Sequence, residues 1–343
     1  MSLAILLLLV AATSANEAEV SIAKGKLQGA KIPHKLGEHY FAFRGIPYAK
    51  PPTKELRFQP PVEVDAWDGV RDASQDGEVC PQWDISQAVV VGDENCLVLN
   101  VYTPKIDEKK RAVMVYFHGG AFIMGGGASF FFGPGYLIDE DVVVVTFNYR
   151  LGPLGFLATK DGTLGGNQAL QDQIMVLNWV RDNIVNFGGD PNRVTLFGED
   201  AGAASITLLT MAPLAKGLFH GAIALSGNAL CDQYFQFRPE EASTDLAARM
   251  ECATDNGEDI VNCLMRKQQQ AIISASQDMA MFWSFPRWFA PTVDGKIIPD
   301  TPDKLLLQGK FAKIPFVQSW LCPCNGVFQP TMCVMTVVVV NNM

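Results

Sequence analysis

Histidine is scarce in this chain of 343 residues and is missing from its final part. The only four are His34, His39, His118 and His220, and the last acidic residue is Asp303. General-base catalysis most often uses histidine, with aspartate or glutamate as the other frequent choices. The segment after Asp303 therefore contributes neither a histidine base nor a carboxylate, which excludes catalytic mechanisms that take these groups from there.

Long runs of basic residues are also absent. The chain has 27 lysines and arginines against 36 aspartates and glutamates, so its net charge is −9. Proteins that follow a phosphate backbone present a basic face, which this composition does not provide. We expect no nucleic-acid partner.

Long apolar segments of membrane-spanning length are missing as well. The N-terminal apolar run, residues 3–10, is too short to cross a bilayer, so we expect no transmembrane anchor. Small residues follow it and end at 13–15, which is typical of a signal-peptide cleavage site, although a buried N-terminal strand is the alternative. The interpretation is a signal peptide over residues 1–15 and a secreted, extracellular protein.

Cysteine, in contrast, is plentiful. Eight cysteines fit an oxidising compartment. Cys322 and Cys324 flank a proline, but no histidine, aspartate or glutamate lies near them in sequence, so we expect no metal site and no cofactor. Two pairs bracket short loops that disulfides close readily, whereas the other four have no assignment: the pairs are Cys80 with Cys96 and Cys252 with Cys263, and the others are Cys231, Cys322, Cys324 and Cys333.

The rest of the sequence is organised around residues 198–203, Gly-Glu-Asp-Ala-Gly-Ala. They follow the apolar run 194–197 and precede residues 204–209, which we expect to be helical. A strand, a tight turn between small residues and a helix are typical of the nucleophile elbow G-x-S-x-G, where sterics demand glycine. Here Asp200 stands in the serine position. Taken alone, the pattern also fits an aspartate that caps a helix.

Apolar runs alternate with a helical stretch through the middle of the chain. In residues 168–187 the apolar side chains recur near helical spacing, which predicts a helix with one buried stripe, ended by residues 188–191. This alternation predicts an α/β fold with a mostly parallel central sheet flanked by helices. We expect a small N-terminal sheet with loops within residues 20–58, and strands at 94–102, 112–117, 142–147, 194–197 and 222–226.

The strand expected at 112–117 runs into His118-Gly119-Gly120-Ala121-Phe122. A strand that ends in glycines exposes backbone N–H groups, which an oxyanion hole requires. A glycine-rich turn is the alternative interpretation.

These motifs, in this order, resemble the carboxylesterase type-B family, which includes cholinesterases, juvenile-hormone esterases and insect carboxylesterases on the α/β-hydrolase fold. The resemblance extends from about residue 20 to residue 316 and implies that fold, with hydrolysis of carboxylic esters through an acyl-enzyme as the family reaction. The matching stretches are FRGIPYAKPP, ENCLVLNVYTP, HGGAF, NYRLGPLGFL, GNQALQDQIMVLNWVRDNIVNFGGDPNRVTLFGEDAGAAS and FAPTVDGKIIPD.

By this resemblance, the oxyanion-hole donors would be the backbone N–H groups of Gly120, Ala121 and Ala201. The two bracketed cysteine pairs match the first two disulfide loops of the family. Structural ion pairs are implied for Arg44 with Glu94 and for Arg150 with Asp172.

The nucleophilic serine of the family falls at Asp200, and its acid and histidine partners would follow later in the chain. Asn325 stands close to the acid position, and no histidine follows His220. A carboxylate at position 200 would also occupy the site that an oxyanion hole reserves for developing negative charge. We therefore expect catalytic impairment or inactivity.

Two further functions stay open. One is a non-catalytic ligand-binding or adhesion homologue like the neuroligins, which keep the fold without the serine. The other is an Asp200-nucleophile hydrolase like the haloalkane dehalogenases and epoxide hydrolases, which also need a histidine to activate water. The expected partners are a small-molecule ester or hydrophobic ligand, or a protein partner if the chain is non-catalytic.

The domain prediction has three parts: a signal peptide at 1–15, an incomplete carboxylesterase domain at 16–316 and a divergent tail at 317–343. From the resemblance, we expect the C-terminal third of the family fold to be missing. Residues 334–340 are uncharged and, apart from Met335, β-branched, which is typical of aggregation-prone windows.

Overall fold

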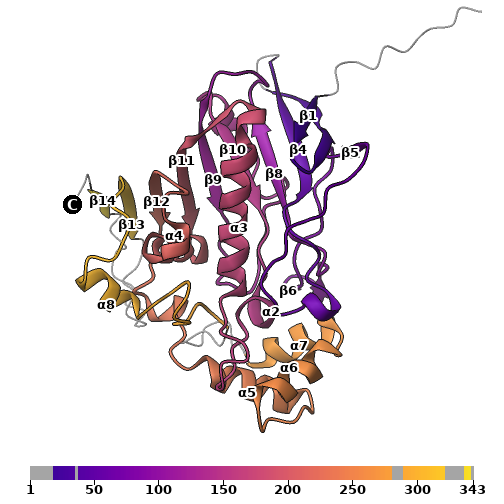
Figure 1. Ribbon diagram of the computed structural model, residues 1–343, viewed down its shortest axis with the longest axis vertical. Helices are drawn as coiled ribbons and strands as arrows, with labels where there is room; N and C mark the ends of the chain where they lie inside the picture. The colour runs from indigo at the N-terminus through magenta and orange to yellow at the C-terminus, as the bar shows by residue number, and fades with distance from the viewer. Residues whose placement is uncertain (1–17, 35–37, 280–288, 321–335, 341–343) are drawn as a thin grey trace, which may run out of the picture.

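A nine-stranded sheet forms the centre of the computed structural model, which describes residues 18–34, 38–279, 289–320 and 336–340 (Figure 1). The predicted signal peptide lies outside the described residues, as do Cys322, Cys324, Asn325 and Cys333. In spatial order the strands are β14 (Thr336–Val340), β13 (Phe316–Trp320), β12 (Gly221–Leu225), β11 (Gly189–Glu199), β9 (Arg111–Phe117), β10 (Val143–Phe147), β8 (Val98–Thr103), β4 (His39–Pro47) and β3 (Ala30–Pro33).

The middle of this sheet is parallel. Strands β13, β12, β11, β9 and β10 run in the same direction, and antiparallel strands flank them on both sides. All five residues of β10 are buried, as expected for a strand whose two faces are both covered. The predicted α/β class with a mostly parallel central sheet is confirmed.

Helices α3 and α4 pack on β11, and α5, α6 and α7 gather at one end of the sheet (Figure 1). Helix α3 buries more than the predicted stripe, since Asp172 and Gln173 are also inaccessible to solvent. The helices are α1 (Gly135–Ile138), α2 (Gly152–Phe156), α3 (Gln168–Asn183), α4 (Ala201–Met211), α5 (Pro239–Arg249), α6 (Gly257–Met265), α7 (Gln269–Met279) and α8 (Pro302–Leu307), with 3-10 turns η2 (Lys54–Leu56), η3 (Ile184–Phe187), η4 (Pro213–Ala215) and η5 (Asp232–Tyr234).

The N-terminal region differs from the prediction of one small sheet within residues 20–58. Strand β4 joins the central sheet through β8, where Phe43 lies opposite Val101. Burial explains this, because the Phe43 side chain is fully buried and packs edge-on against Phe187 at 5.0 Å between ring centroids. The small sheet itself contains β1 (Glu19–Ile22), β2 (Gly25–Gln28) and β5 (Val70–Asp72), and β6 (Gln82–Asp84) pairs separately with β7 (Val89–Val91).

The tail beyond residue 316 begins inside the sheet. The predicted boundary falls at the first residue of β13, which pairs with β12 in parallel register, Val317 opposite Ile223. Strand β14 then runs antiparallel to β13, with Val338 opposite Gln318. Part of the predicted divergent tail therefore extends the central sheet.

Candidate active site

Asp200 occupies a sharp turn between β11 and α4. Its backbone has φ 53° and ψ −123°, a conformation that glycine adopts readily and other residues rarely do. The turn needs small neighbours, because a Cβ atom on Gly202 would lie 2.0 Å from the carbonyl oxygen of Phe117. The Asp200 N–H donates to the carbonyl of Leu225 at 3.0 Å, which ties the turn to β12. The local geometry is that of the predicted elbow.

The glycine-rich stretch after β9 approaches this turn. Gly120, Ala121 and Phe122 all have positive φ, at 104°, 56° and 64°. The carbonyl of Phe122 accepts a hydrogen bond from the Gly152 N–H at 2.7 Å, which fixes the far side of the stretch. This backbone turns successive N–H groups toward Asp200.

The Asp200 carboxylate lies directly against these N–H groups. Gly120 N–H and Ala121 N–H donate to its Oδ2 at 2.8 and 2.7 Å, and the Tyr234 hydroxyl donates to Oδ1. Ala201, the third expected donor, is fully buried at the start of α4. Among the described residues, the Ala201 N–H makes no hydrogen bond to the Asp200 side chain. Both carboxylate oxygens are thus engaged.

The alternative of a helix-capping aspartate is wrong. Asp200 stands at the N-cap position of α4, but its side chain accepts no capping hydrogen bond from the helix. The carboxylate accepts instead from the Gly120 and Ala121 N–H groups.

Tyr234 was not among the residues predicted from sequence. It lies in η5, 34 positions beyond Asp200, and only 4% of its surface is exposed. Its ring stands edge-on to Phe122, with centroids 6.3 Å apart. No spacing motif links the two positions, so the residue pattern carried no signal for this contact.

His118 hydrogen-bonds to the backbone of the glycine-rich stretch and is not positioned as a base. Its Nδ1 lies 2.8 Å from the carbonyl oxygen of Gly119, which can only accept, so Nδ1 carries the proton. The ring stacks on Tyr149 at 4.1 Å, and Nε2 is buried without a partner in the described residues. Burial lowers the pKa of His118 to about 4, so its imidazole is neutral at physiological pH.

The other three histidines are engaged elsewhere. His34 Nε2 lies 2.6 Å from Asp139 Oδ1, and His220 Nδ1 accepts from the Val194 N–H at 3.3 Å. His39 packs edge-on against Phe41. All four histidines of the chain fall within the described residues, and none of them hydrogen-bonds to Asp200.

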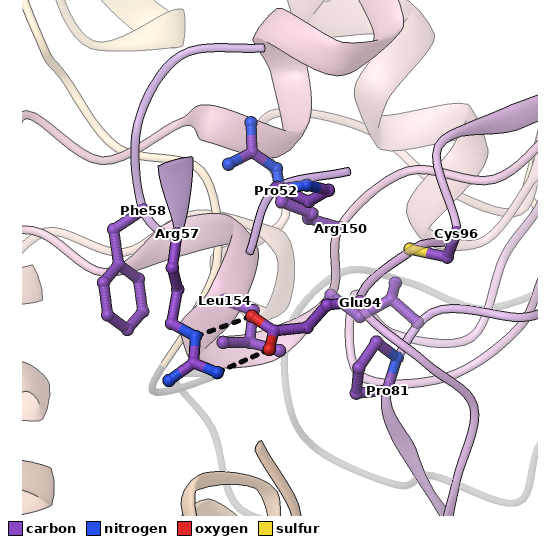
Figure 2. Close-up of a pocket in the computed structure, with 9 residues that line it drawn as sticks. Pro52, Arg57, Phe58, Pro81, Glu94, Cys96, Arg150 and Leu154 are labelled. Carbon is purple, nitrogen blue, oxygen red and sulfur yellow. Dashed lines mark hydrogen bonds and ion pairs between the residues drawn. The ribbon is translucent and has the colours of Figure 1, made fainter. Parts of the chain in front are cut away.

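One predicted ion pair is confirmed and the other is wrong. Arg150 forms a buried pair with Asp172 at 2.7 Å, whereas Glu94 pairs with Arg57 and not with Arg44. Figure 2 shows the Arg57 guanidinium facing both oxygens of Glu94. Arg44 is held by Asp76, Ser129 and the carbonyl of Ser74.

Arg57 also joins distant parts of the chain. Its Nη1 donates to the carbonyls of Leu264, Met265 and Lys267, at 3.2, 3.0 and 2.7 Å. The first two carbonyls belong to the last residues of α6, and the third lies two positions beyond its end. Arg57 thus carries the structural role that the resemblance implied for Arg44.

Both predicted disulfides are present: Cys80 bonds to Cys96, and Cys252 to Cys263. Cys231, which sequence left unassigned, is also disulfide-bonded. Among the described residues, no cluster of three or more histidine, cysteine, aspartate or glutamate side chains is suited to a metal ion. No helix in that part of the chain has the length and apolar character needed to span a membrane.

Comparison with known proteins identifies the family. The sequence profile described as "Carboxylesterase family" matches residues 16–320. Esterase E4 of Myzus persicae is 39% identical over 306 residues, which cover 86% of this chain and 55% of that protein. Juvenile hormone esterase of Tribolium castaneum is 40% identical over 311 residues, covering 85% and 52%. Neuroligin-3 of Mus musculus is 35% identical over 350 residues, covering 89% and 42%.

The chain spans about half the length of the curated relatives it matches. The match nevertheless extends over nearly all of the described fold, including β11, the Asp200 turn and the glycine-rich stretch after β9. This chain belongs to the carboxylesterase family.

Proposed function

We propose that this chain is a carboxylesterase-family protein that binds a ligand without turning over esters. The observation that carries the proposal is the pair of hydrogen bonds from Gly120 N–H and Ala121 N–H to Oδ2 of Asp200. In an ester hydrolase these donors would stabilise the oxyanion of the tetrahedral intermediate. Here a carboxylate of the protein already fills their position.

Charge adds to this steric argument. An ester carbonyl that approached Gly120 and Ala121 would develop negative charge next to the Asp200 carboxylate. Like charges at contact distance repel, and the preorganised donors are not free to compensate. The transition state for acyl transfer would therefore be destabilised in the place where hydrolases stabilise it.

The contacts of Asp200 also oppose its own use as a nucleophile. Attack requires an oxygen lone pair directed at the substrate, whereas Oδ2 is held by two N–H donors and Oδ1 by Tyr234. Release of the covalent intermediate would further require a base to activate water. None of the four histidines hydrogen-bonds to Asp200, so none of them is placed to accept a proton in a second step.

The ligand class we propose is a small ester or another hydrophobic molecule. The family match and the resemblance to esterases support it. A protein partner is the second candidate, and the similarity to Neuroligin-3 together with Asp200 in the serine position favours it. We further infer secretion, which the apolar run 3–10, the small residues after it and the disulfides support.

Hydrolysis of 4-nitrophenyl acetate by the pure protein tests the central proposal. The wild-type chain, Asp200→Ala and the exposed control Asp182→Ala should all hydrolyse it no faster than the background reaction of a protein surface. Asp200→Ser should gain no sustained turnover, because no histidine stands ready to activate it. Multiple turnovers in the wild type that disappear only in Asp200→Ala would overturn the proposal.

The mass of the protein recovered from the medium of expressing cells tests secretion separately. A chain that begins near residue 16 supports it. Full retention inside the cells with residues 1–15 still attached contradicts it.

A further inference from the structure

A hollow lies between the C-terminal end of α4 and the segment 309–313, at the opposite end of α4 from Asp200. Its volume is about 530 Å³, within the range of pockets that hold small organic ligands. The walls are mostly apolar and include Met211, Pro213, Phe219, Pro299, Leu305 and Phe311.

Backbone hydrogen bonds hold the two sides of this hollow together. Ala312 N–H donates to the carbonyl of Thr210 at 2.7 Å, which joins the 309–313 segment to α4. Lys310 N–H donates to the carbonyl of Leu305 at 2.9 Å, which closes the end of α8. The hollow is therefore a fixed feature of the fold, formed by segments about a hundred positions apart in sequence.

Three lysines are among the residues that line the hollow. Lys216 comes from the α4 side, and Lys310 and Lys313 come from the opposite side. All three are exposed, and the Lys313 ammonium lies 5.7 Å from the centroid of the Phe311 ring. The nearby carboxylate of Asp300 also interacts electrostatically with Lys310. It is engaged by the Lys304 ammonium at 3.2 Å and accepts a hydrogen bond from the Thr301 N–H at 2.8 Å. A local cluster of positive charge thus borders an apolar surface in a chain whose net charge is −9.

We propose that this hollow binds a small amphiphilic anion, an alkyl carboxylate of medium chain length. Its alkyl chain would lie against Met211 and Phe311, and its carboxylate among Lys216, Lys310 and Lys313. Burial of methylene groups supplies most of the affinity, and the lysines select a negative head group over a neutral or positive one. This binding is separate from the proposed role of Asp200 and does not depend on it.

Calorimetric titration with sodium octanoate tests the proposal on the full chain. Octanoate should bind measurably, and 1-octanol should bind more weakly because it lacks the charge. Butanoate, with four fewer methylenes, should bind about a hundredfold more weakly. Equal affinity for octanoate and octanol, or no octanoate binding, would overturn the proposal.

Variants locate the site. The triple substitution Lys216→Gln, Lys310→Gln and Lys313→Gln should weaken octanoate binding about tenfold, since three screened charge contacts are removed. These side chains are exposed, so the fold should be preserved. The control is a matched variant in which three other exposed lysines are changed, Lys31→Gln, Lys54→Gln and Lys160→Gln. Its net charge changes by the same amount, and it should bind octanoate like the wild type.

Asp200→Asn separates the two sites, because it keeps an oxygen acceptor for the Gly120 and Ala121 N–H groups and vacates no position that a carboxylate could fill. It should leave octanoate affinity unchanged if the ligand occupies the hollow beside α8. Loss of octanoate binding in this variant, or equal weakening by both lysine triples, would assign the binding elsewhere and overturn the inference. Catalytic hydrolysis by the wild type would refute the proposed function and leave this result untouched.

Discussion

Removing the carboxylate of Asp200 should open an anion site that a small carboxylate can refill. In Asp200→Ala the N–H groups of Gly120 and Ala121 lose their acceptor, while the hydrogen bond between Gly152 and Phe122 still holds the stretch that carries them. The Tyr234 hydroxyl loses its acceptor too. Acetate has the size and charge of the deleted group, so it should bind in the vacated position.

The size of the effect follows from these contacts. Hydrogen bonds to a charged group contribute about 1.5–3 kcal/mol each, but Asp200 is only half-buried and water can replace part of them. We expect Asp200→Ala to lower the free energy of unfolding by about 3 kcal/mol. If acetate binds with a Kd of about 10 mM, then about 100 mM acetate restores about 1.4 kcal/mol, or about 2 °C in Tm.

Thermal unfolding in acetate and in chloride of equal ionic strength measures this. Acetate should raise the Tm of Asp200→Ala, and leave unchanged the Tm of the wild type and of the exposed control Asp182→Ala. An equal response in all three proteins would mean that acetate acts elsewhere. No response in Asp200→Ala would refute the view that Gly120 and Ala121 form an anion site occupied by the protein itself.

Three further perturbations test other parts of the structure. Burial lowers the pKa of His118 to about 4, so protonation of the unfolded chain should reduce the free energy of unfolding by about 3 kcal/mol between pH 6.5 and pH 4, and urea titrations of His118→Gln should lack this slope. Arg57→Ala leaves Glu94 buried without its cation and should cost about 3–5 kcal/mol in urea unfolding, against less than about 1 kcal/mol for the exposed Arg181→Ala. Replacing both cysteines of the Cys252–Cys263 disulfide, which are 11 positions apart, should cost about 3 kcal/mol, and an unchanged urea midpoint would contradict the loop-closure argument.

Much of the fold followed from local patterns in the sequence. The strands expected at 112–117, 142–147 and 222–226 are found within one residue at each end, because continuous apolar runs suit buried parallel strands. The elbow at Asp200 followed from glycine spacing, since only small residues permit the close approach of α4 to β9. Local sterics determine these features, so local sequence predicts them.

Contacts between distant segments were harder to predict. The expected meeting of Asp200 with the Gly120 and Ala121 donors depended on the resemblance, whereas Tyr234 reaches the same carboxylate from a turn without any motif. Glu94 pairs with Arg57 and not with Arg44, and carbonyls at and just beyond the end of α6 hold Arg57 in place. Side-chain partners of this kind are decided by tertiary packing, which spacing along the chain does not encode.

The Arg57 contacts have a consequence for the kinetics of folding. They join residues 207, 208 and 210 positions apart in sequence, so they can form only after most of the chain between them has been ordered. Interactions that form after the transition state slow unfolding while leaving the folding rate nearly unchanged. Arg57 should therefore act chiefly on how long the native state persists once it has formed.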